Sequence, residues 1–79
     1  MRTAKTKLSK RTKATYILAK EQGEYSIVCV EEESNGTLEI YKASHLTTNK
    51  DLANKMFKKI VKSKVCGVTL LDVIYNLIE

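Results

Sequence analysis

The feature that most constrains the fold is a turn signal, Ser34-Asn35-Gly36, between two stretches in which apolar and polar residues alternate. The length of this turn sets the register, because a slip of one residue moves every side chain to the other side of a sheet. A two-residue turn would place Ile40 opposite Glu31. A three-residue turn, with the glycine in the left-handed position of a bulge, instead places Ile40 opposite Val30. We therefore predict a three-residue turn.

This register divides the apolar side chains of the hairpin between two faces. We call one the aliphatic face, and it consists of Val28, Val30, Leu38 and Ile40. We call the other the tyrosine face, and it consists of Tyr25, Ile27, Cys29 and Tyr41. A small sheet rarely has enough helix to cover both sides, although a wrapped sheet with both faces internal is the alternative. We expect helices on the aliphatic face, which leaves the tyrosine face as the candidate protein interface, since tyrosines around an aliphatic centre suit such contacts.

The remaining pattern predicts one more strand and two helices. A strand-like run covers residues 14–20, before the two strands of the hairpin at residues 25–32 and 38–43. The helices begin at two capping patterns, Thr48-Asn49-Lys50-Asp51 and Thr69-Leu70-Leu71-Asp72. Between them, Gly67 is free to adopt a positive backbone angle at the break. The predicted fold is α+β, a three-stranded antiparallel sheet followed by two C-terminal helices in the order β-β-β-α-α.

A charge boundary lies near residue 13. The residues before it include six basic and no acidic side chains, whereas the whole chain carries a net charge of +5. We predict a disordered basic arm over residues 1–13 and a single small domain over residues 14–79. Such an arm could contact a polyanion or be a solvated tail. The polyanion-contact candidates combine the arm with the lysines of the first helix: Arg2, Lys5, Lys7, Lys10, Arg11, Lys13, Lys55, Lys58, Lys59 and Lys62.

Composition limits the class of protein. The chain has 79 residues, of which 43% are apolar, and this favours one folded domain with a small hydrophobic core. Cys29 and Cys66 have neither the spacing of a zinc site nor that of a redox motif, and we expect both to act as small apolar side chains. No apolar run resembles a secretory signal or approaches a membrane span, so we expect a cytoplasmic protein without membrane insertion.

No residue pattern indicates catalysis, a metal or a cofactor. His45 is the sole histidine and comes with no nucleophile pattern. Glu31-Glu32-Glu33 lacks the spacing of a calcium loop, and we interpret it as a solvated strand end. Asp51 and Asp72 each follow a threonine at a helix start, where a carboxylate favours the helix dipole, so we do not interpret them as a catalytic pair. We expect a protein that is not an enzyme and has no small-molecule substrate.

The C-terminal two thirds of the chain resemble a known family. The stretch "HLTTNKDLANKMFKKIVKSKVCGVTLLDVIYNLIE" is similar to a family of short Firmicutes proteins that carries only a domain-of-unknown-function label. That family's pattern is a strand, a charged helix, a short break and a terminal "L-x-D-V-I" helix, and its last motif reads here Leu70-Leu71-Asp72-Val73-Ile74. The resemblance covers about residues 25–79 and implies a bacterial protein with no catalytic residues.

These observations predict a small non-enzymatic binding or regulatory module. Protein contact or self-association through the tyrosine face is the leading hypothesis. The alternative is an accessory nucleic-acid-binding protein, in which the basic arm supplies phosphate contacts and the helix lysines orient it.

Overall fold

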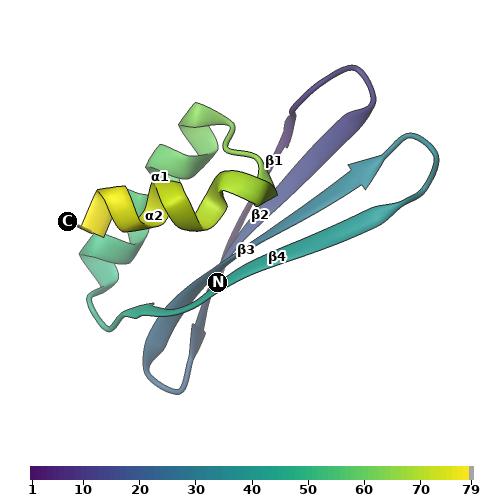
Figure 1. The fold of residues 1–79 in the computed structure, drawn as a ribbon. Coiled ribbons are helices and arrows are strands. Elements are labelled where there is room, and N and C mark those ends of the chain that lie inside the picture. The colour runs from purple at the N-terminus through teal and green to yellow at the C-terminus, as the bar shows by residue number, and fades with distance from the viewer. Residues whose placement is uncertain (79) are drawn as a thin grey trace.

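The computed structural model describes residues 1–78, which form a four-stranded antiparallel sheet followed by helices (Figure 1). The strands are β1 (Arg2–Lys7), β2 (Thr12–Glu21), β3 (Glu24–Glu33) and β4 (Leu38–Thr47), and they pair in chain order. The helical part comprises α1 (Lys50–Ser63), a 3₁₀ turn η1 (Gly67–Thr69) and α2 (Leu70–Ile78). The predicted α+β class and the sheet-then-helices order are confirmed. The predicted number of strands is wrong, because the sheet has four.

The additional strand is β1, which lies within the predicted disordered arm. It pairs with β2 in register from Arg2 opposite Leu18 to Lys7 opposite Lys13. Its small side chains, Ala4 and Thr6, are half-buried, whereas Lys5 and Lys7, which alternate with them, are exposed. A strand without large apolar residues gains little stability alone, and here its pairing with β2 supplies the backbone hydrogen bonds. The prediction of a flexible arm is therefore wrong for residues 2–7.

Two different turns set the register of the central strands. The backbone N–H of Glu33 donates to the carbonyl of Thr37 at 2.9 Å, which leaves a three-residue turn with Gly36 at φ +90°. Val30 then lies opposite Ile40, so the predicted register of this hairpin is confirmed. Between β2 and β3 the turn has only two residues, Gln22 and Gly23, both with positive φ as tight hairpins require.

The helices pack on the tyrosine face, so the predicted choice of face is wrong (Figure 1). The short turn between β2 and β3 places Tyr16 opposite Cys29 and Leu18 opposite Ile27. The tyrosine face thereby gains two large apolar side chains of β2, whereas the aliphatic face gains one, Ile17, so covering the tyrosine face buries more apolar area. Ile27 and Cys29 are fully buried, and Tyr25 and Tyr41 are half-buried.

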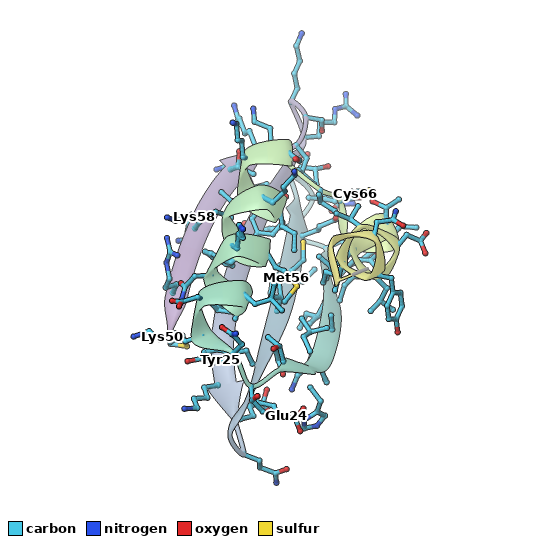
Figure 2. All side chains as sticks on the ribbon, turned by 90° about the vertical axis from the view of Figure 1, so that its left-hand side faces the viewer. Glu24, Tyr25, Lys50, Met56, Lys58 and Cys66 are labelled. Atoms are coloured by element: carbon cyan, nitrogen blue, oxygen red, sulfur yellow. The ribbon has the colours of Figure 1, made fainter. Side chains whose placement is uncertain are left out.

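Helix α1 lies across the sheet with one apolar stripe inward. Its buried side chains recur at helical spacing: Ala53, Met56, Phe57 and Ile60. Figure 2 shows Met56 pointing toward the sheet and Lys58 pointing away from it. The helix cap is one residue later than predicted, because the Asn49 side chain, and not that of Thr48, accepts the Leu52 N–H at 3.1 Å.

Helix α1 ends in a Schellman motif around Lys64. The Lys64 N–H donates to the carbonyl of Val61 and the Val65 N–H to that of Ile60, at 3.2 and 3.3 Å. Lys64 adopts φ +50°, the left-handed conformation that glycine usually supplies. The buried Val65 and Ile60 complete the motif as its apolar pair.

Replacement of Lys64 by glycine is expected to stabilise the fold by about 0.5–1 kcal/mol. The change removes the cost of a left-handed non-glycine residue, and it leaves both hydrogen bonds of the motif in place. Thermal unfolding should show a rise in midpoint of roughly 3–6 °C. Lys62→Gly, two residues earlier within the helix, is the matched control and should lower the midpoint. A fall for Lys64→Gly would contradict the left-handed geometry.

Three contacts hold the segment between α1 and α2 against the sheet. The Tyr16 hydroxyl donates to the Val65 carbonyl at 2.6 Å, and the Glu31 carboxylate accepts the Gly67 N–H. Gly67 packs on the ring of Tyr41, and a Cβ at this position would lie 1.9 Å from a ring carbon. The predicted positive backbone angle at Gly67 is wrong, since among the described glycines only Gly23 and Gly36 have one. Gly67 is required for close packing.

Candidate protein interface

Within residues 1–78, no helix lies on the aliphatic face of the sheet. Strand β2 extends this face, because Thr15 lies opposite Val30 and Ile17 opposite Val28. Two of its large apolar side chains are exposed, Leu38 at 56% and Ile40 at 68%. The described residues thus leave a continuous aliphatic surface across three strands, with half-buried Ile17 at its centre. A surface of this kind marks a site of macromolecular contact more often than a solvated sheet.

Charged side chains border the aliphatic face at both ends. Near the hairpin tips the charged residues are Lys7, Lys13 and Glu32, which lie side by side on β1, β2 and β3 and are followed by Leu38 on β4. At the other end, Lys42 Nζ lies 2.8 Å from Glu21 Oε1, and this hydrogen bond lowers the pKa of the Glu21 carboxyl. The site therefore has an apolar centre and a polar rim, the usual anatomy of a protein interface.

The tyrosine face is not available as a site. Tyr25 and Tyr41 lie beside the buried Ile27 and Cys29 under the helices, so the predicted interface is part of the core. Burial raises the pKa of the Cys29 thiol to about 11. The thiol of Cys66 is half-exposed beside η1, and a hydrogen bond with the Thr69 hydroxyl lowers its pKa. In accordance with the sequence prediction, Cys29 is a buried apolar residue.

The structure divides the predicted polyanion contacts among three places. Arg2 lies on the helix side, where its guanidinium stands 5.2 Å from the centre of the Phe57 ring and donates to Asn54 Oδ1. Lys5, Lys7 and Lys13 lie on the aliphatic face, with Lys10 and Arg11 in the turn beside them. The helix lysines lie on the exposed side of α1, away from the sheet: Lys55, Lys58, Lys59 and Lys62.

The basic turn that contains Lys10 and Arg11 lies beside the acidic end of β3, at Glu32 and Glu33. The Ser34 N–H donates to the Arg11 carbonyl at 2.8 Å, which joins the tip of the β3–β4 hairpin to that of the β1–β2 hairpin. Glu32 and Glu33 lie opposite Lys13 and Thr12. This proximity offsets part of the positive potential that the sequence suggested for the N-terminal segment.

The polar residues considered as catalytic candidates lie at separate positions. His45 lies where the pairing of β4 with β3 changes register and has φ +53°, and its Nδ1 is 3.6 Å from Glu24 Oε1. Asp51 and Asp72 each lie in the first turn of their helix, as expected for dipole partners. Glu31, predicted to be a solvated strand end, instead anchors Gly67. Within residues 1–78 no three metal-ligating side chains come together.

A second apolar stripe lies on the outer side of η1 and α2. Its exposed members are Val68, Leu71 and Tyr75. None of the helices in the described part of the chain has the length and apolar character needed to cross a membrane.

The aliphatic face was identified in the sequence as a surface but not as the open one. The missed signal is Gln22-Gly23, since a two-residue turn there fixes which residues of β2 join each face. With that register, Tyr16 and Leu18 add to the tyrosine face. The larger apolar face is then the one that the helices must cover.

Comparison of the chain with protein-family models, with curated proteins and with solved structures found no match. The resemblance to a family of short Firmicutes proteins stays a prediction from the sequence.

Proposed function

We propose that this protein is a small non-enzymatic binding module that contacts a protein partner through the aliphatic face of its sheet. The observation that carries the proposal is the exposure of Leu38 and Ile40 on the edge strand β4 of an uncovered sheet face, on the side opposite the helices. Burial of such side chains releases water from apolar area, which is the main favourable term in protein association.

The chemical character of this face favours protein over single-stranded nucleic acid. Its centre is aliphatic and largely β-branched: Thr15, Ile17, Val28, Val30 and Ile40. Sheets that bind single strands use aromatic rings on which bases stack. Here Tyr16, Tyr25 and Tyr41 are on the covered side, so the open side offers no ring to a base.

A photo-crosslinking pair tests the proposal in the protein's native cells. Benzoylphenylalanine at Ile40 is expected to give protein adducts, because this position lies in the proposed interface. The same group at Val68 is the matched control, since Val68 is exposed to a similar degree, 74% against 68%, but lies on the other side of the molecule. Equal adduct yields at both positions, or none at Ile40, would contradict the proposal.

Polyanion binding by the β1–β2 hairpin is a second candidate. It is favoured by five basic residues on the open face and in the turn of this hairpin: Lys5, Lys7, Lys10, Arg11 and Lys13. Binding of a labelled DNA duplex that falls steeply with added salt, and that Arg11→Glu weakens, would support it. The adjacent Glu32 and Glu33 reduce the field that such binding requires, so we rank it second.

A further inference from the structure

We infer that the partner of the aliphatic face is a second copy of this chain, packed face to face as a two-layered β-sandwich. This inference rests on the proposed function and names the occupant of the same surface. It is supported by the positions of charged and apolar side chains on the four strands. Under one two-fold axis, a basic residue of each copy faces an acidic residue of the other, and the exposed apolar side chains are covered.

An axis parallel to the strands, between β2 and β3, places each β2 over the second copy's β3. Lys13 and Glu32 are neighbours across these two strands. Rotation about the axis therefore sets Lys13 of each copy opposite Glu32 of the other, so one interface gains two ion pairs. Aligned sheets cross at roughly 30°, and the long lysine side chain spans the resulting offset.

The same rotation covers the two exposed aliphatic side chains. It places β1 over the second copy's β4, with Lys7 above Leu38 and Lys5 above Ile40. Lysine stems pack along apolar surface while the ammonium groups stay in water at the rim. At the centre, Ile17 meets Val28 of the other copy, and Thr15 meets Val30.

An axis perpendicular to the strands gives a poorer match. It places each strand over the same strand of the second copy, running in the opposite direction. With the axis between Ile40 and Lys42, Lys42 of one copy lies opposite Ile40 of the other. With the axis at this position Lys13 meets Ala19, and no opposite charges face each other. With the axis at Ile17, Lys13 meets Glu21, but Glu32 then meets Glu24 and Lys42 meets Lys42. The parallel axis sets Lys13 against Glu32, and it brings like charges together at the far end of the strands, where Glu21 meets Glu24; charge complementarity therefore favours the parallel axis.

The size of the face suits a weak dimer. Strands about 4.8 Å apart, with face residues about 6.6 Å apart along each strand, give a plane of roughly 19 by 20 Å. Two such faces together remove on the order of 1,000 Å² from water, which lies at the lower limit for specific interfaces. We expect a dissociation constant on the order of 10 μM.

Charge exchange between two variants tests this arrangement on the full-length chain. In sedimentation equilibrium, Lys13→Glu alone and Glu32→Lys alone should each associate at least tenfold more weakly than the wild type, because like charges then face each other twice. An equimolar mixture of the two should regain wild-type affinity within a few-fold. Both variants keep a net positive charge, so general attraction between them does not explain the rescue.

The design separates contacts within a chain from contacts between chains. Lys13 and Glu32 are also neighbours within one sheet, and mixing two variants leaves each chain's internal repulsion in place. Lys58→Glu, an equal charge change on the exposed side of α1, is the control. It pairs with itself like the wild type, so its effect is measured through a fluorescent label on Glu32→Lys, and it should not draw the labelled variant into dimers.

The inference is overturned if the wild type stays monomeric at about 1 mM, a hundred times the expected dissociation constant. It is equally overturned if the mixture associates no better than the single variants, or if Lys58→Glu rescues as well as Lys13→Glu. The crosslink at Ile40 distinguishes failure of the homodimer from failure of the proposed function. Adducts with a different protein would retain the proposed function and reject the homodimer, whereas absence of adducts would reject both.

Discussion

Gly67→Ala is expected to destabilise the protein by about 3 kcal/mol, the upper part of the range for overpacked sites. The added methyl group would lie 1.9 Å from one carbon of the Tyr41 ring and 2.4 Å from the next. Either the ring must leave its site or the segment between α1 and α2 must lift from the sheet, and the latter change also breaks the Glu31 contact. Chemical denaturation monitored by circular dichroism measures the loss.

A double-mutant cycle identifies the cause. In a Tyr41→Ala background the ring is gone, so Gly67→Ala should cost less than 1 kcal/mol, which corresponds to a coupling of about 2 kcal/mol. Val68→Ala, at the next residue and on an exposed side chain, is the control and should change stability by less than about 0.5 kcal/mol. A similar cost for Gly67→Ala in both backgrounds would exclude the ring contact as the reason.

The local parts of the fold could be predicted from the sequence because they depend on neighbouring residues. The register of β3 and β4 follows from the turn at Ser34–Gly36, and the buried stripe of α1 follows from helical spacing. The cap of α1 differs by one residue, since Thr48 and Asn49 both have side chains suited to the role.

The choice of covered face could not be made from the β3–β4 hairpin alone. Each of its faces is apolar, and the decision depends on which face receives Tyr16 and Leu18 from β2. That depends in turn on the Gln22-Gly23 turn, whose residues are a weaker hairpin signal than the asparagine and glycine of the other turn. Because this turn was not predicted, the sequence placed the candidate site on the tyrosine face, whereas the structure leaves the aliphatic face open.

Strand β1 could not be predicted from the sequence for a different reason. Its alternation of small residues with lysines resembles a solvated tail, because no side chain in it contributes a large buried area. The strand forms through pairing with β2, and its N-terminal arginine is held by Phe57 and Asn54 of α1. These partners are about 50 residues away in the chain, where local propensity gives no information.

Tyr16→Phe is expected to cost about 1–3 kcal/mol at neutral pH, although it removes only one oxygen atom. The hydroxyl is buried and donates to the Val65 carbonyl at 2.6 Å, just after the left-handed residue that ends α1. Without it the carbonyl loses its donor in a site that excludes water. Tyr75→Phe, on an exposed ring of α2, is the matched control and should leave the free energy of unfolding unchanged within about 0.5 kcal/mol.

The same variant should change the response to alkali. Burial raises the pKa of Tyr16 from 10.0 to about 12 in the folded protein, so the protonated phenol favours the fold. This contribution is fully present below pH 10 and is lost as the pH rises toward 12. Wild-type stability should therefore fall between these values, and the fall should be shallower in Tyr16→Phe. Part of it should remain, because the hydrogen bond with Glu39 also raises the pKa of Tyr41 to about 12. An equal fall in both proteins would mean that Tyr16 is accessible to water, and that the segment after α1 is not held to the sheet by its hydroxyl.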